Sequence, residues 1–222
     1  NFSIRLRHRI GVVVTVFIPF AIRRYQAALE VYTRSAFPEY WARTQNGLGN
    51  AYNYRIRGER AENLDRAVVC YEAALEVRSK SAYPEKWATT QFGIAIFYLQ
   101  KTRGSKSENI ETAIRGFQKV VEVKTKEGYP VDWAATHSYL GAAYLKRISG
   151  DVNANIDEAI QCYIKSLEVY TKSSYPIFWA EVNTNLSLAF YRKGSIEEAI
   201  YHAEAALDVY ASPDFASDRA KN

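Results

Sequence analysis

The chain has few of the residues that usually carry catalysis or bind metals. Its 222 residues include three histidines, two cysteines and no methionine. None of the histidines has a cysteine, an aspartate or a second histidine at metal-ligand spacing; they are His8, His137 and His202. A phosphate-binding Gly-x-x-x-x-Gly-Lys-Ser/Thr loop and a recognisable Cys–His nucleophile motif are also absent. The sequence therefore predicts no catalysis, no metal and no cofactor.

Long apolar runs are missing as well. The run 11–20 (GVVVTVFIPF) has ten residues, whereas a membrane-spanning helix needs about 20, so we expect no membrane span. A signal peptide is disfavoured, because a helix in the repeat register described below follows at once. Two interpretations of Gly11–Phe20 remain open. It is either a strand-like or collapsed cap over the end of the array, which we favour, or a docking patch for another domain.

The remaining composition is that of a folded chain without extreme charge. Hydrophobic residues make up 48% of the chain, charged residues 24%, and the net charge is +5. Such a mild positive excess does not by itself indicate nucleic-acid binding. Because the sequence opens on Asn1 inside a repeat and lacks an initiator methionine, we expect it to be a fragment of a longer protein.

What the sequence does contain is one motif written four times. Every tryptophan follows a proline by three residues and recurs after 46 residues, at positions 41, 87, 133 and 179. A fixed period between 20 and 50 residues indicates a stacked repeat array. The period divides a single solenoid, 1–212, into five repeats, the first of them partial, followed by a polar tail at 213–222. The repeats are 1–37, 38–83, 84–129, 130–175 and 176–212.

Each complete repeat is predicted to form two helices. The first starts beside the proline, which suits a first helical turn, and the expected ranges are 39–54, 85–100, 131–146 and 177–192. The second carries an apolar stripe at i, i+4, i+7 and i+8, as in Ala67, Tyr71, Ala74 and Leu75. Its expected N-caps are Asn63, Asn109 and Asn155. No segment alternates like a strand, so the predicted fold class is all-α.

The spacing of the cysteines and tryptophans adds two expectations. Cys70 and Cys162 lie two periods apart, and helices two repeats apart are too distant for a disulfide. We therefore expect two free, buried thiols, as is typical of a reducing, cytoplasmic compartment. The strict period of the tryptophans favours packing between one repeat's second helix and the next repeat's first helix over a ligand cage.

The repeats resemble the tetratricopeptide family. Leu48-Gly49-x-x-Tyr52 followed by Ala67-x-x-x-Tyr71 is similar to that family's L-G-x-x-Y and A-x-x-x-F pattern. The resemblance implies a right-handed α–α superhelix of about four and a half helix hairpins. The period is 46 residues instead of about 34. Six extra residues extend the loop inside a repeat, and the rest is expected to lengthen the second helix and the turn before each tryptophan.

The resemblance also implies a function. Tetratricopeptide arrays are non-catalytic scaffolds that bind a peptide, a partner protein or another domain of the same protein through their concave face. The long repeat is similar to arrays of bacterial and cyanobacterial signalling proteins. The first alternative is therefore the regulatory arm of a larger protein such as a CHAT-type caspase-like protease. The second is nucleic-acid or ribonucleoprotein binding through a basic edge.

By the same resemblance, the first helices line the concave face. The groove-facing residues are then Asn46, Asn50, Asn53, Phe92, Ile96, Leu99, Ser138, Ala142, Leu145, Thr184, Leu188 and Tyr191. None is a lysine or arginine, so we expect no clamp for a terminal carboxylate, and a groove suited to an amphipathic helix or to a segment of the same protein. The alternative is that the leucines and Ile96 simply pack against neighbouring helices.

Basic residues recur after each first helix and predict a positive edge. They are Arg55, Arg57, Lys101, Arg103, Lys106, Lys146, Arg147, Arg192 and Lys193. A functional interpretation is an acidic partner or a nucleic-acid backbone. The interpretation that we favour is structural, because cations at helix C-termini are stabilised by the helix dipole, and exposed aromatic residues are not interleaved with them.

Overall fold

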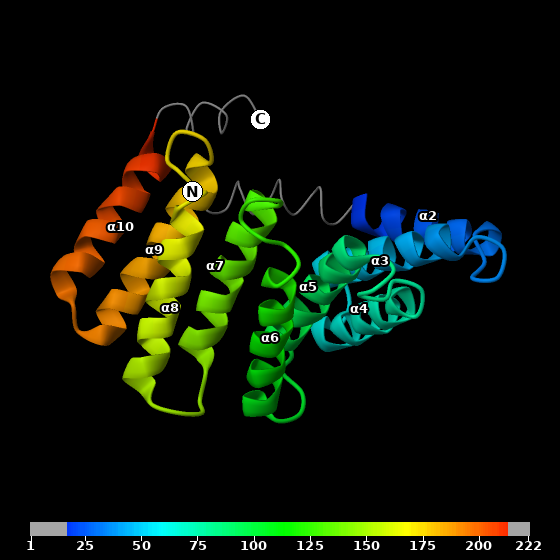
Figure 1. The fold of residues 1–222 in the computed structure, drawn as a ribbon, viewed down its shortest axis with the longest axis horizontal. Coiled ribbons are helices and arrows are strands. Elements are labelled where there is room, and N and C mark those ends of the chain that lie inside the picture. Colours follow the sequence, from blue (N-terminus) through cyan, green and yellow to red (C-terminus); the bar gives the residue numbers. More distant parts are fainter. Residues whose placement is uncertain (1–16, 213–222) are drawn as a thin grey trace. The chain divides into compact units, whose positions relative to one another are not determined.

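The computed structural model describes residues 17–212, and every regular element in that range is a helix (Figure 1). This confirms the predicted all-α class. The helices are α2 (Ile18–Val31), α3 (Pro38–Tyr54), α4 (Arg60–Leu75), α5 (Pro84–Gln100), α6 (Lys106–Val121), α7 (Pro130–Lys146), α8 (Val152–Leu167), α9 (Pro176–Lys193) and α10 (Ile196–Ala211). The first helices of the repeats agree with the predicted ranges to within one residue at each end.

Two predicted segments lie wholly or partly outside the described residues. The polar tail 213–222 is one, and most of the apolar run 11–20 is the other. The last residues of that run, Ile18–Phe20, form the first turn of α2. The expected strand-like cap is therefore wrong for these residues, which continue the helical repeat.

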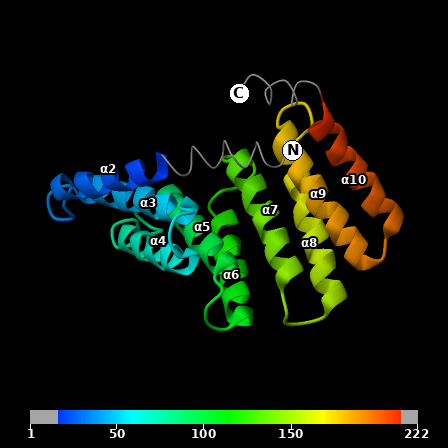
Figure 2. The same ribbon diagram turned by 180° about the vertical axis from the view of Figure 1, so that it is seen from behind.

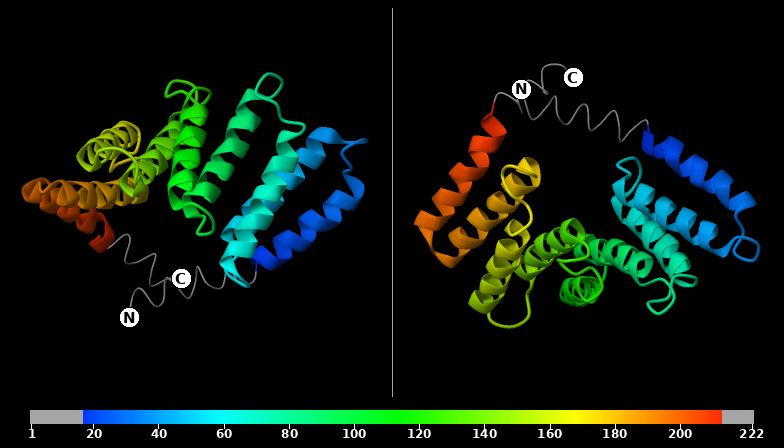
Figure 3. Two further views of the ribbon diagram at one scale, coloured as in Figure 1. Left: turned by 90° about the horizontal axis from the view of Figure 1, so that it is seen from below. Right: turned by 45° about the horizontal axis from the view of Figure 1, so that its top comes forward.

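The chain divides into two compact halves, an N-terminal half (1–109) and a C-terminal half (110–222). In the N-terminal half, α2 packs on α3, α3 on α4 and α4 on α5 (Figure 3). In the C-terminal half, α7 to α10 pack in the same sequential way (Figure 2). The first helices of successive repeats also touch each other, α3 with α5 and α7 with α9. Each half is therefore a row of helix hairpins in which neighbouring first helices share one face.

The turn that leads into each proline has the same backbone form every time. The residue before the proline has φ between −139° and −141° and ψ between 58° and 63° in all four copies. A hydroxyl at the start of the turn, on Thr33, Ser79, Thr125 or Thr171, accepts a hydrogen bond from the backbone three residues later. The second helices end before this turn, at Leu75, Val121 and Leu167. The extra length before each tryptophan thus lies in the turn, not in a longer second helix.

A tyrosine on the second helix holds neighbouring first helices together. A Cβ placed on Gly49 of α3 would lie 2.7 Å from the Tyr71 ring, and one on Gly93 of α5 would meet the same ring at 2.7 Å. Tyr163 takes the same place against Gly141 of α7, at 2.8 Å. Both tyrosines are fully buried. The glycines are required here because only a residue without a side chain leaves room for the ring.

The asparagines predicted as N-caps of the second helices have a different role. Asn63, Asn109 and Asn155 lie inside α4, α6 and α8 and are buried. Their side-chain amides donate to loop carbonyls, for example Asn155 Nδ2 to Ser149 O at 2.8 Å. The observed cap of α8 is Asp151, whose Oδ1 accepts from Ala154 N at 2.8 Å. The prediction failed because the carbonyls of the six-residue insertion need a buried donor.

Replacing Asn155 by alanine is expected to lower the free energy of unfolding by about 1–2 kcal/mol, because the Ser149 carbonyl loses its donor. Urea denaturation followed by tryptophan fluorescence measures this change. Asn153→Ala is the matched control, since Asn153 is exposed in the same turn of α8. Equal losses in the two variants would show that Asn155 does not anchor the loop.

The tryptophans have equivalent surroundings. All four are half-buried, and each is followed by a fully buried alanine. A cation seven residues earlier covers each ring at 5.3–5.8 Å from its centroid; the pairs are Arg34–Trp41, Lys80–Trp87, Lys126–Trp133 and Lys172–Trp179. Trp179 packs against Ala206 and Val209 of α10, the second helix of its own repeat, whereas the sequence placed the indole against the preceding second helix. The preceding repeat contributes the cation.

Candidate functional site

The predicted groove residues divide into buried and accessible groups. Asn53, Ile96, Leu99 and Leu145 are at most 8% exposed, so their side chains serve packing. Asn46, Phe92, Ser138 and Ala142 are half-buried, and Asn50, Thr184, Leu188 and Tyr191 are exposed. Three of the accessible polar groups bind within the fold: Asn50 Oδ1 accepts from Tyr71 Oη at 2.7 Å, Asn46 Oδ1 accepts from Thr90 Oγ1 at 2.9 Å, and Thr184 Oγ1 donates to Ala180 O at 2.9 Å.

A pocket of about 260 Å³ opens between α7 and α9 in the C-terminal half. One wall comes from α7, one from α9, and Tyr170 contributes from the turn between α8 and α9. Its lining residues are Ala135, Ser138, Tyr139, Ala142, Tyr170, Phe178, Glu181, Val182 and Asn185. The pocket is therefore mostly aromatic and apolar, with a few polar groups, which is the usual make-up of a ligand site.

A stacked aromatic pair forms part of the pocket. The rings of Tyr170 and Phe178 lie 5.0 Å apart at 21°. Tyr170 is 3% exposed and its hydroxyl donates to Val131 O at 3.2 Å, whereas Phe178 is 47% exposed. The inner ring is thus fixed, and the outer ring offers a face to whatever enters the pocket.

The turn that contains Tyr170, together with the start of the helix after it, forms a seam between two repeats. At the two equivalent seams before it in the chain, charged residues occupy these positions. One period before Tyr170 and Phe178 stand Lys124 and Asp132, which form an ion pair at 3.0 Å although Lys124 is only 7% exposed. Two periods before Tyr170 stands the buried Arg78, which pairs with Glu39 at 3.0 Å; the equivalent of Glu39 two periods later is Val131, whose carbonyl accepts from Tyr170. Burial opposes the ionisation of Glu39, but hydrogen bonds from Lys86 and Arg78 outweigh it and lower the pKa of that carboxyl. At those seams the protein supplies both charges.

Glu181 at the pocket has no such partner. Its side chain is exposed and forms no ion pair among residues 17–212, and the partial burial of its carboxyl raises the pKa above the usual value. Burial, with the carboxylates of Asp132 and Glu181 nearby, also raises the pKa of Tyr170 to about 12. The pocket therefore joins an unpaired carboxylate to neutral aromatic rings.

A second polar group near the pocket is left without a partner. In the N-terminal half the Tyr71 hydroxyl donates to Asn50, the residue after Gly49. The residue after Gly141 is Ala142, which lines the pocket, and the buried Tyr163 hydroxyl has no hydrogen-bond partner within the described part of the chain. The hydrogen bond that the repeat tyrosine forms in the N-terminal half is therefore missing among the described residues of the C-terminal half, next to a residue that lines the pocket.

Sequence reasoning found two of the lining residues, Ser138 and Ala142, and missed the rest. Two of the missed residues, Glu181 and Asn185, occupy positions at which the residue type changes between repeats. Position 185 is Asn where the earlier repeats have Gly47, Gly93 and Tyr139, and position 181 is Glu where they have Arg, Thr and Ala. A comparison of the repeats position by position would have singled out these places.

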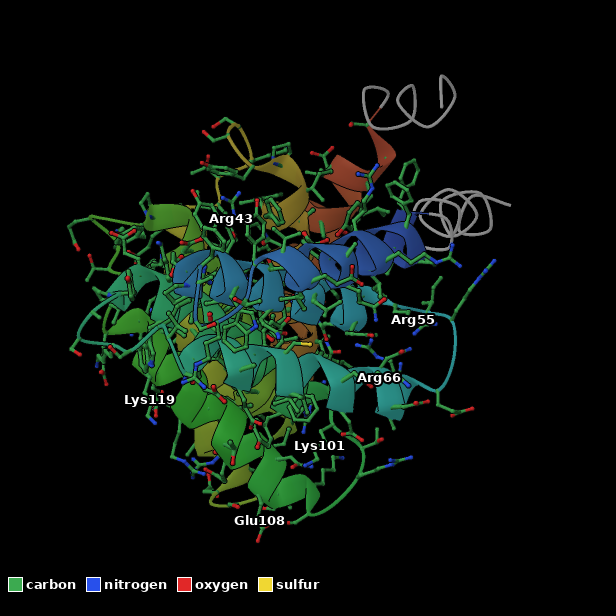
Figure 4. The ribbon with its side chains drawn as sticks, turned by 90° about the vertical axis from the view of Figure 1, so that its right-hand side faces the viewer. Arg43, Arg55, Arg66, Lys101, Glu108 and Lys119 are labelled. Atoms are coloured by element: carbon green, nitrogen blue, oxygen red, sulfur yellow. The ribbon has the colours of Figure 1, made fainter. Side chains whose placement is uncertain are left out.

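About half of the predicted basic edge is used within the fold. Three cations form ion pairs, namely Arg103–Asp65 (3.4 Å), Arg147–Glu111 (2.7 Å) and Lys193–Asp157 (2.6 Å). Arg192 donates to the Leu145 carbonyl at 2.6 Å. Figure 4 shows Arg55 and Lys101 on the side where the loops after α3 and α5 lie. Arg55, Arg57, Lys101, Lys106 and Lys146 form no ion pair with any described residue. These contacts favour a structural role for the paired cations.

The cysteines and histidines do not form a reactive site. Cys70 and Cys162 are free and buried, as predicted. Burial raises the pKa of Cys70 to about 11 and that of Cys162 to about 12, so both remain protonated and poor nucleophiles. His137 is buried beside Trp133, and His202 Nδ1 lies 2.7 Å from Asn183 Oδ1. In the described range, no three acidic, His or Cys residues gather as metal ligands.

None of the helices between residues 17 and 212 is both long enough and apolar enough to cross a membrane.

Solved structures share the arrangement of helices. BtubC (BKLC) from P. vanneervenii matches with a TM-score of 0.69 and 18% identity over 93% of this chain and 80% of its own. A putative kinesin light chain from P. anserina with nearly identical TPR-like repeats has a TM-score of 0.62 at 16% identity, covering 93% and 96%. MamA has a TM-score of 0.55 at 17% identity, covering 94% and 91%.

No protein-family model and no curated protein matches the chain. The link to CHAT-type proteins thus stays a prediction from sequence. The repeated helix hairpins and the three structural matches together show that the chain has the fold of tetratricopeptide-like helical-repeat proteins.

Proposed function

We propose that the chain is a non-catalytic scaffold that binds a segment of a protein partner along the shared face of α7 and α9. The observation that carries this proposal is the pocket of about 260 Å³ between these two first helices. The resemblance to tetratricopeptide repeats places the first helices on the binding face, and Ser138 and Ala142 were among the groove residues predicted from it.

The surface of α9 extends the pocket in a way that suits a chain segment. Glu181, Asn185 and Leu188 follow each other at i, i+4 and i+7, so they lie along one stripe of the helix. Leu188 is 51% exposed and Tyr191, one turn further, is 66% exposed. A bound segment could place one side chain in the pocket and lay apolar residues along the stripe, as helical and extended peptides do in grooves.

Filling the pocket should weaken this binding at least tenfold. A random peptide library is selected on the wild-type chain, and the recovered peptides are then measured on Ser138→Trp and Gln161→Trp. We expect at least a tenfold loss of affinity with Ser138→Trp, because its indole occupies the pocket that Ser138 lines. Gln161 is exposed on α8, so the control adds the same ring outside the pocket and should bind as the wild type does.

Two outcomes would contradict the proposal. One is that no peptide is recovered, and the other is that all three proteins bind the recovered peptides equally. Salt dependence separates the basic edge from the pocket. Binding of a nucleic-acid backbone by six to ten cations loses about 10³–10⁵ in affinity between 50 and 200 mM salt. We expect less than a tenfold loss for a peptide that binds in the pocket.

A further inference from the structure

The pocket carries a charge pattern that indicates what side chain enters it. In the preceding repeats a buried cation pairs with a carboxylate, in Lys124–Asp132 and Arg78–Glu39. The equivalents of both partners are uncharged at the pocket, where Tyr170 replaces the cation, and Phe178 and Val131 replace the carboxylates. Glu181 is a separate carboxylate, which has Ala135, Thr89 and Arg43 as its equivalents and forms no ion pair with any described residue. It is therefore a negative charge at the pocket without a cation partner in the described part of the chain.

The aromatic walls favour the same kind of ligand. Phe178 stands one turn from Glu181 on α9 and exposes its outer face, and Tyr139 lines the opposite wall on α7. Ring faces attract cations, more so where water is partly excluded. A carboxylate beside exposed ring faces therefore suits a flat, delocalised cation that stacks and forms paired hydrogen bonds at once.

The N-terminal half offers an internal comparison. Its seam between the first two described repeats also has a stacked aromatic pair, Tyr32 and Tyr40, with ring centroids 5.2 Å apart. The residue equivalent to Glu181 there is Arg43, labelled in Figure 4. The position next to a stacked aromatic pair therefore holds an arginine in one repeat and a glutamate in another. Packing of the repeats does not require the negative charge of Glu181.

We propose that the pocket binds an arginine side chain of the partner segment, with its guanidinium against the Phe178 ring and paired with the Glu181 carboxylate. This inference rests on the proposed function, since it names the side chain that the bound segment places in the pocket. Lysine fits less well, because its ammonium is a compact, strongly hydrated point charge that cannot lie flat on the ring and pair with both carboxylate oxygens at the same time.

The probe is N-acetyl-arginine-N-methylamide, with the citrulline analogue as its neutral isostere. Both are titrated into the ¹⁵N-labelled chain, and backbone amide shifts are followed by NMR. We expect saturable shifts at Ser138, Glu181 and Asn185 with the arginine compound, and at least tenfold weaker binding of the citrulline compound.

Variants of the carboxylate complete the test. Glu181→Gln should weaken arginine binding at least tenfold, and Glu181→Arg should abolish it. Glu204→Gln removes the same charge from an exposed site on α10 and should leave binding unchanged. The Arg43 precedent indicates that both Glu181 variants fold, which their NMR spectra verify directly.

Equal binding of arginine and citrulline, unchanged binding by Glu181→Gln, or no shift at the pocket would overturn the inference. The arginine assignment can fail while the proposed function holds. If selected peptides require the open pocket yet keep their affinity when each arginine is replaced by citrulline, the scaffold function stands and the arginine assignment falls.

Discussion

Replacing Gly141 by alanine is expected to lower the free energy of unfolding by up to about 2 kcal/mol. A Cβ at this position would lie 2.8–3.0 Å from three atoms of the Tyr163 ring, which is fully buried and has no room to retreat. Overpacking of this kind costs about 1–3 kcal/mol, and it outweighs the roughly 1 kcal/mol that alanine gains over glycine in a helix. Urea denaturation followed by tryptophan fluorescence measures the effect.

Gly128→Ala provides the control, because the nearest atom to its new Cβ would be Thr125 Oγ1 at 3.6 Å, an ordinary contact. The last repeat shows how the fold accommodates a larger residue. Ser187 replaces the glycine there, its hydroxyl donates to Ala199 O at 2.8 Å, and the residue equivalent to Tyr163 is Ala203. Equal stability of the Gly141 variant and the wild type would show that the tyrosine is not confined as the structure indicates.

Lowering the pH from 7 to 4.5 is expected to remove about 2 kcal/mol of stability through His137 alone. Burial, aided by the positive charge of Lys165, lowers the pKa of His137 to about 4. Below pH 6.5 the unfolded chain takes up a proton that the folded chain refuses. The contribution of His137 is therefore complete above about pH 6.5 and is lost as the pH falls towards 4.

The variant His137→Gln isolates this contribution, because the equivalent positions in the second and third repeats are Gln45 and Gln91. Urea denaturation of both proteins at pH 7 and pH 4.5 gives the difference. Carboxylates with lowered pKa values, such as Glu111 beside Arg147, stabilise both proteins less at low pH. Their contribution is the same in the two proteins and cancels in the difference. An identical pH dependence of the two proteins would contradict the assignment.

The helices could be predicted because their signals are local and repeated. Each proline fixes the start of a first helix, and the apolar stripe that includes Tyr71 fixes the face of a second helix. The strict period also predicted that the tryptophans share one environment. The cations above the indoles were not foreseen, because the turn that brings Arg34 or Lys126 over a ring has no helical period.

The asparagines show the limit of a local rule. An asparagine at the start of a helix is usually a cap, but Asn63 and Asn155 serve the loop before the helix instead. Their role depends on where the inserted loop places its carbonyls, and this is a three-dimensional property that the sequence does not state.

The pocket could be predicted only in part. The family resemblance pointed to Ser138 and Ala142, whereas Tyr170 enters from the turn between α8 and α9 and stacks on Phe178. The family resemblance also placed Ile96 and Leu99 on the binding face, and they are buried. Burial against neighbouring helices depends on how hairpins pack, and a single helical period does not report it.

The most direct test of the scaffold proposal is photo-crosslinking at the pocket. The photoreactive residue p-benzoylphenylalanine is placed at Ser138 in one variant and at Gln161 in another, and each is irradiated with a labelled peptide from the library selection. We expect a cross-link at Ser138 that excess unlabelled peptide removes, and none at Gln161. Cross-linking at Gln161 alone, or equally at both places, would show that partners do not bind along the α7–α9 face.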